Sequence, residues 1–180
     1  MAETKYLYGA AVQGIQSFIF QTNELRDIVG ASELVEQICT KAFEDFGKDG
    51  ENGKAVVTAA GNIKFIFDKR EYCELAVLEF PKKVMETAPG ITISQAVVTM
   101  DGEYSNFEKA VNKLEEKLRT QRNRPMPSLT TGFMGLERSR KTGLPAVKYD
   151  SDDKEFLDKA TLQKKEYDDD AKDRLCKKAF

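Results

Sequence analysis

The chain has 180 residues, 41% of them apolar, and a formal net charge of −2. This length and composition provide one core of ordinary size plus an appendage. The sequence contains no histidine, which excludes serine-histidine and cysteine-histidine catalysis, histidine-ligated metals and histidine-aspartate phosphohydrolase sites.

The longest apolar runs are far shorter than the roughly 20 residues that a membrane-spanning helix needs. The N-terminus lacks the apolar region and cleavage site of a secretory signal, so we expect a cytoplasmic protein without a membrane partner. Cys39, Cys73 and Cys176 are widely spaced and have no histidine companions. We therefore expect buried thiols, and neither a zinc site nor a disulfide framework.

The first predicted elements are a strand and a helical region. Residues 6–12 have the aromatic and β-branched character of a strand. Apolar residues at helical spacing then predict helices over 15–46. We predict a break at Gly30, because Ser32 can cap a new helix there with acidic side chains in its first turn.

The next predicted elements are a hairpin and a second helix. Two short apolar runs, 55–59 and 63–67, are joined by a turn at 60–62, which predicts a β-hairpin. Asp68 begins a pattern typical of a capping box, and the amphipathic helix that follows is expected to kink at Pro81.

Residues 91–100 predict a fourth strand, and a second capping box at Ser105 precedes a helix that ends before Pro125. The order β-α-β-β-α-β followed by a helix predicts an α+β fold of the ferredoxin-like type. We therefore expect this domain over residues 1–124.

We expect an irregular connector over 125–149, where prolines and glycines are frequent, and a charged, helix-permissive extension outside the core over 150–180. The extension ends without a stop signal, so we expect the chain to be a piece of a longer protein.

Charge is unevenly distributed. Residues 117–148 carry eight basic and one acidic side chain, whereas 1–116 carry 12 basic and 19 acidic side chains. The basic stretch can bind a polyanion such as RNA, and a solvated charged face is the alternative interpretation. The candidate RNA-binding residues are Arg122, Arg124, Arg138 and Arg140.

The predicted helix start at Gly30 is the leading candidate for a nucleotide site, because exposed amides and the Ser32 hydroxyl can bind phosphate. The same residues can form an ordinary helix cap. Gln13 and Gln16 can add polar contacts or simply face solvent. Asn62 can contribute its amide oxygen, although asparagine at a hairpin turn is usually there because it tolerates positive φ.

Four aromatic residues alternate along the two predicted central strands: Tyr6, Tyr8, Phe65 and Phe67. Such rings can stack RNA bases, or they can form one buried face of the sheet. Exposure of Phe65 and Phe67 would indicate RNA stacking, whereas burial would favour the second interpretation.

Three segments carry a resemblance to a known family: VQGIQSFI at 12–19, LRDI at 25–28 and GASEL at 30–34. Residues 6–37 resemble the opening of a palm domain in the large polymerase-cyclase subunit of type III CRISPR effector complexes. That family has two palms. One bears a Gly-Gly-Asp-Asp hairpin and joins ATP into cyclic oligoadenylates, and the other lacks this motif and forms the opposite wall.

The chain resembles the second palm, because 11–14 and 59–62, where a palm holds its two Mg²⁺ ions, contain no carboxylate. The resemblance implies an antiviral defence protein in which this palm is non-catalytic and helps bind ATP. The Mg²⁺ would come from a Gly-Gly-Asp-Asp palm in the same or a partner chain. Other CRISPR effector subunits and guide or target RNA are the further implied partners.

Residues 135–147 resemble a remnant of the family's zinc ribbon without its cysteines, so no zinc is expected. We expect no catalytic residue in this chain, although its parent protein would be a nucleotidyltransferase that makes cyclic oligoadenylate. A stand-alone ferredoxin-like RNA-binding module remains the alternative function.

Overall fold

The computed structural model describes residues 4–100, 106–124 and 135–168. Its main sheet is antiparallel, with the strand order β2-β3-β1-β4. The four strands are β1 Lys5–Gln13, β2 Gly53–Ala59, β3 Asn62–Phe67 and β4 Thr92–Met100. This order confirms the predicted ferredoxin-like α+β fold.

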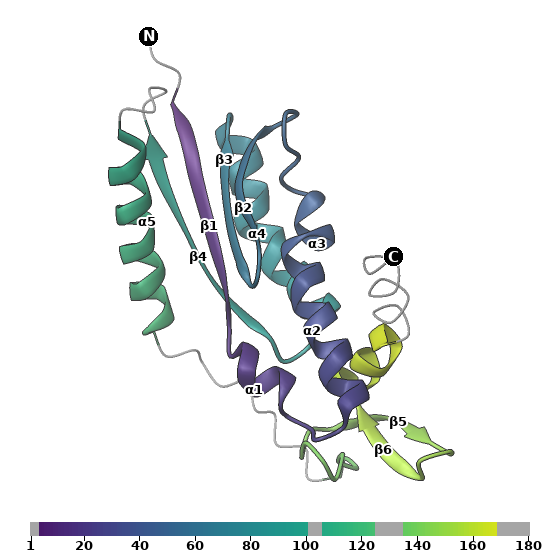
Figure 1. Cartoon of the computed structure of the whole chain (residues 1–180). Helices are drawn as coiled ribbons and strands as arrows, with labels where there is room; N and C mark the ends of the chain where they lie inside the picture. The colour runs from purple at the N-terminus through teal and green to yellow at the C-terminus, as the bar shows by residue number, and fades with distance from the viewer. Residues whose placement is uncertain (1–3, 101–105, 125–134, 169–180) are drawn as a thin grey trace.

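Helices cover both faces of the sheet (Figure 1). They are α1 Ile15–Ile19, α2 Leu25–Cys39, α3 Lys41–Glu44, α4 Arg70–Thr87 and α5 Phe107–Arg122. Helices α2, α3 and α4 lie on one face, and α5 lies on the other. Because side chains alternate along a strand, Tyr8 contributes to the core under α3 and α4, and Leu7 contributes to the core under α5.

The aromatic residues of the central strands belong to the first of these cores. Phe65 and Phe67 are both 0% exposed, and both rings pack against Phe43 of α3. The hypothesis that these rings stack RNA bases is therefore wrong, since α3 covers the surface on which bases would lie. Tyr8 stacks on Phe43 as well, and its hydroxyl donates to Gln95 at 3.0 Å.

The predicted cap of α4 is not formed. Helix α4 begins after Lys69 without a side-chain cap, and Asp68 instead pairs with Lys5 at 3.0 Å. Pro81 lies within α4, which continues to Thr87. The capping residue predicted for α5, Ser105, lies outside the described residues.

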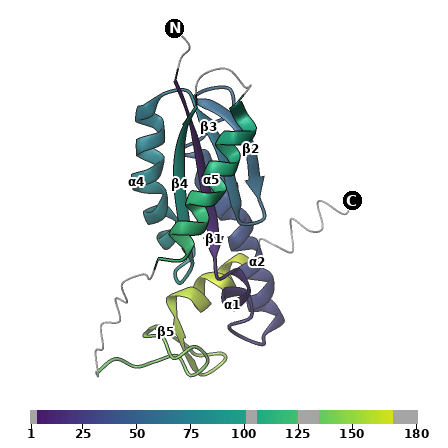
Figure 2. The same cartoon turned by 90° about the vertical axis from the view of Figure 1, so that its left-hand side faces the viewer.

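The C-terminal part contains a second, two-stranded sheet of β5 Ala146–Asp150 and β6 Glu155–Asp158, followed by a helix over 159–168. Figure 2 shows this part beside α1, at one end of the main sheet. The predicted boundary between connector and extension falls inside β5. The helical character of the extension is confirmed for 159–168. Its placement outside the core is wrong, because Ala160 belongs to the same core as Tyr8, on the face covered by α2, α3 and α4.

Both described cysteines, Cys39 and Cys73, are buried free thiols as predicted, and burial raises the pKa of each to about 11. Cys176 lies outside the described residues. Within 4–100, 106–124 and 135–168, no helix is long and apolar enough to cross a membrane.

Candidate functional site

The end of β1 lies directly beside the β2–β3 turn. Ala11 is paired with Asn62 across the sheet, and the Val12 amide donates to the Gly61 carbonyl at 2.8 Å. Ala60 and Gly61 both have positive φ, of 53° and 78°, so the hairpin turn is tight. The two segments expected to meet in a palm therefore do meet here.

Helix α1 starts at this same edge. Gly14 has a φ of 66°, and its carbonyl accepts hydrogen bonds from the Phe18 amide at 2.9 Å and the Ser17 hydroxyl at 2.8 Å. The positive φ of Gly14 lets the chain turn from β1 into α1 within one residue. A side chain at Gly61 would collide with Ile15, since its Cβ would lie 2.5 Å from the Ile15 Cδ1 atom.

The polar groups at this edge are neutral amides. Gln16 and Asn62 are exposed, and Gln13 is half-buried. The Asn62 amide donates to the Ala60 carbonyl at 3.3 Å, and the Gln13 amide donates to the Ala11 carbonyl at 3.2 Å. The positive-φ residues of the turn are Ala60 and Gly61, so the expected conformational role of Asn62 is wrong.

These amides can hydrogen-bond a base or a sugar, but they bind a divalent ion weakly compared with carboxylates. Among the described residues there is no group of three or more cysteines and acidic residues that could hold a metal ion.

The predicted helix start at Gly30 and Ser32 is wrong. Helix α2 runs unbroken through both residues, and the Ser32 hydroxyl donates to the Ile28 carbonyl one turn earlier, at 2.9 Å. Gly30 is buried, and a Cβ added there would lie 1.9 Å from the Lys164 carbonyl oxygen. The glycine allows α2 to contact the 159–168 helix, and no free amides of a helix start are presented at this position.

The four candidate arginines are all exposed, as predicted, but they lie in two places. Arg122 and Arg124 line a cavity of about 570 Å³ together with Gln13. Arg138 and Arg140 lie in the loop before β5, where the Arg138 guanidinium donates to the Gly143 carbonyl at 2.9 Å.

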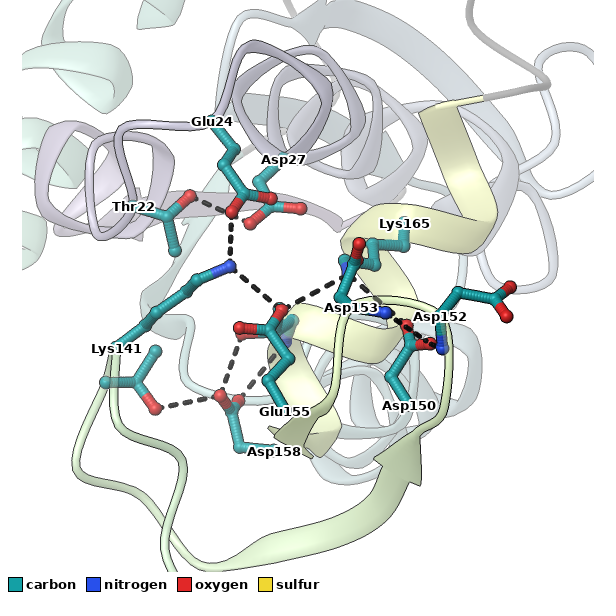
Figure 3. Close-up of polar contacts among 12 residues, drawn as sticks. Thr22, Glu24, Asp27, Lys141, Asp150, Asp152, Asp153, Glu155, Asp158 and Lys165 are labelled. Carbon is teal, nitrogen blue, oxygen red and sulfur yellow. Dashed lines mark hydrogen bonds and ion pairs between the residues drawn. The ribbon is translucent and has the colours of Figure 1, made fainter.

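An ionic cluster joins the C-terminal part to the loop between α1 and α2 (Figure 3). Lys141 binds both Glu24 and Glu155, the latter at 2.8 Å. Lys165 binds Asp153 at 2.7 Å and Glu155 at 3.4 Å. Burial alone would lower the pKa of each lysine, but these hydrogen bonds and charges outweigh it and raise both pKa values.

Lys164 is the most buried cation of this region, at 0% exposure. Its ammonium donates to the Phe18 carbonyl at 2.7 Å, donates to Gln21 at 3.2 Å, and lies 4.2 Å from the Phe18 ring centroid. Burial lowers the pKa of this ammonium. Lys164 thereby provides a hydrogen-bond donor to the carboxyl end of α1, the helix that begins where β1 ends beside the β2–β3 turn.

Sequence reasoning missed this cluster, because its members are far apart in the chain and each looks like an ordinary surface charge. Asp27 is an example: it is fully buried, its Oδ2 atom accepts from Thr22 at 2.9 Å, and burial raises its pKa. The ion pairs of the cluster join residues of this chain to one another. The cluster therefore holds the C-terminal part against the loop before α2.

The fold is similar to solved structures of the Csm1-Csm4 cassette. The cassette in complex with pppApApA has a TM-score of 0.56 and 17% identity, covering 76% of this chain and 21% of that chain. The apo cassette has a TM-score of 0.53 and 18% identity, covering 67% and 18%. The cassette with one ATP has a TM-score of 0.52 and 18% identity, covering 67% and 19%.

At this identity the likeness shows the fold alone, and the chain spans only about a fifth of the solved chains that it matches. No protein-family model and no curated protein matches the sequence.

Proposed function

We propose that this chain is a non-catalytic palm module of a type III CRISPR-like antiviral defence protein. In this role it packs against a catalytic Gly-Gly-Asp-Asp palm and helps hold ATP for cyclic oligoadenylate synthesis. The metal ions and their carboxylate ligands belong to the catalytic palm, and neutral amides of this chain contact the nucleotide.

The observation that carries the proposal is the edge where β1 meets the β2–β3 turn. There the end of β1 pairs with the β2–β3 turn, which is the pairing that a palm requires, and the side chains are Gln13, Asn62 and small or apolar residues. Two-metal phosphoryl transfer needs carboxylates beside the α-phosphate. The first acid after the turn in this part of the chain is Asp68, directly after β3. Five strand residues place it about 16 Å from the turn, and it pairs with Lys5.

The comparisons support the same proposal at the level of the fold. One similar cassette was solved with ATP and another with pppApApA, an adenylate oligomer. The three sequence motifs that resemble the family lie on α1, on α2 and at the end of β1, which are the elements around this edge.

Amide chemical shifts measured by NMR test the nucleotide contact. We expect ATP, added to the labelled chain together with a Gly-Gly-Asp-Asp palm, to shift the amides of Gln13, Gly14, Gln16 and Asn62. Asn62→Ala should weaken ATP binding about 3- to 10-fold, as expected for the loss of one hydrogen bond. The control is Asn112→Ala, which removes an exposed amide from α5 instead of from the turn.

ATP-dependent shifts that avoid these four amides would contradict the proposed site. Equal affinities of the Asn62→Ala and Asn112→Ala variants would do the same.

A further inference from the structure

A groove runs between α5 and the edge strand β4. Strand β4 is the last strand of the main sheet, so its outer side is not covered by another described strand. Two cavities of about 570 and 490 Å³ lie along it and share Gln121 and Arg124. Together they form one groove that follows β4 from Thr92 to Val97.

Basic side chains line the α5 wall of this groove. They are Lys113, Lys117, Arg122 and Arg124, and the one acid among the lining residues is Glu116. Lys113 and Lys117 are four residues apart, which places them on one face of α5, and Arg124 follows two residues after the helix ends. All four cations are exposed.

These cations form no ion pairs with the part of the chain that the structure describes. No ion pair joins any of the four to a residue within the described part of the chain. Lys117 donates to the Val97 carbonyl at 2.8 Å, which holds its ammonium at the strand edge. By contrast, Glu115 of α5 pairs with Lys64 of β3. An uncompensated line of positive charge favours a polyanionic ligand.

The shape of the groove favours a single strand over a duplex. Residues 92–97 of β4 extend about 17–20 Å at 3.3 Å per residue, and residues 113–122 of α5 extend about 15 Å at 1.5 Å per residue. A concave groove with charge along one wall accepts a flexible single strand, whereas a duplex is usually met by a protruding helix or ribbon. Ala96 lines the groove and packs against the core under α5, so an apolar surface is available beneath the bases.

We propose that the groove between α5 and β4 binds the phosphodiester backbone of a single-stranded nucleic acid. Lys113, Lys117, Arg122 and Arg124 contact phosphates, and recognition is independent of base sequence because phosphate contacts carry no sequence information. This role does not require the chain to be part of an oligoadenylate synthase. It also separates Arg122 and Arg124 from Arg138 and Arg140, which line neither cavity.

Fluorescence anisotropy with labelled oligo(U) and oligo(dT) of about 15 nucleotides tests the proposal. Four phosphate contacts predict a slope of about −3 in log affinity against log salt, so raising salt from about 50 to about 200 mM should weaken binding roughly 50-fold. The Lys113→Ala/Arg124→Ala double variant should lose at least about 10-fold in affinity at low salt, and its salt slope should be about 1–2 units shallower.

The matched control is Arg138→Ala/Arg140→Ala, which removes the same charge from another surface. Its affinity should stay within about 2-fold of the parent chain, and circular dichroism melting should show that both double variants remain folded. The proposal is overturned if no oligonucleotide binds at low salt, or if the two double variants lose affinity equally. Preference for a duplex, or competition by polyglutamate as effective as that by unlabelled oligo(U), would overturn it too.

Discussion

Gly30 lies where the backbones of α2 and the 159–168 helix come closest. Its missing side chain leaves room for the Lys164 carbonyl oxygen, which would be 1.9 Å from a Cβ atom. No local pattern could distinguish this role from a helix break, because the partner comes from the far end of the chain. The nucleotide site predicted at Gly30 and Ser32 rested on that break.

We expect Gly30→Ala to destabilise the protein by about 1–3 kcal/mol or more, because the collision is with backbone and cannot be relieved by rotating a side chain. Urea denaturation measures the change. Gly135→Ala is the control, since its Cβ would meet no atom within 4 Å and its φ is not in the left-handed range. Equal stabilities of the two variants would show that α2 and the C-terminal helix are not tightly packed.

At the scale of elements, the main sheet and its turns could be predicted from sequence, and the C-terminal part could not. Alternating apolar residues and the Ala60-Gly61 turn are local signals, and they specify β1 to β4 directly. Most of β5 falls in the predicted irregular connector, and β6 falls in the predicted charged extension. In the fold, Lys165 of the 159–168 helix pairs with Asp150, Asp153 and Glu155, and these ion pairs hold the β5–β6 hairpin against that helix.

The edge of β1 was also predictable, since it depends on the same local signals. The α5–β4 groove was predictable only in part: Arg122 and Arg124 stood out by charge density. Lys113 and Lys117 could have been added from their spacing of four residues on a helix.

Asp158 caps the C-terminal helix. Its Oδ1 atom accepts from the Ala160 and Thr161 amides at 2.9 and 3.1 Å, and its Oδ2 atom accepts from the Thr142 and Thr161 hydroxyls, both at 2.8 Å. Burial alone would raise the pKa of this carboxyl, but the four hydrogen bonds outweigh it and lower the pKa. The helix is therefore held by an ionised cap.

Replacing Asp158 by Ala should cost about 2 kcal/mol of unfolding free energy, because a buried cap and its partners are lost together. Asp158→Asn isolates the charge. Since the folded pKa lies below the unfolded value of about 3.8, the carboxylate stabilises the fold fully above that pH. This stabilisation is lost as pH falls through the lowered pKa.

Denaturation of the parent chain and Asp158→Asn at several pH values measures this difference. The parent's advantage should be constant near neutral pH and shrink in acid, whereas Asp152→Asn, an exposed carboxyl, should show no such trend. An advantage that grows in acid would contradict the assigned direction of the pKa.

At the scale of the whole molecule, the C-terminal part is docked on α1 and α2, near the edge where β1 meets the β2–β3 turn. Lys164 holds the end of α1, and Lys141 ties the loop before α2 to β6. This arrangement fixes α1 and α2 at the edge where we place ATP. The basic groove between α5 and β4 reaches this edge at Gln13, which lines its cavity of about 570 Å³, so the two proposed ligands lie next to each other there.

The central claim is that the chain contributes nucleotide contacts but no catalysis. Anion-exchange chromatography of products formed from ATP with Mg²⁺ or Mn²⁺ tests it most directly, for the chain alone and for the chain with a Gly-Gly-Asp-Asp palm. We expect no oligoadenylate from the chain alone, and synthesis with the catalytic palm that Asn62→Ala reduces. Metal-dependent oligoadenylate from the pure chain, abolished by one substitution within it, would contradict this account.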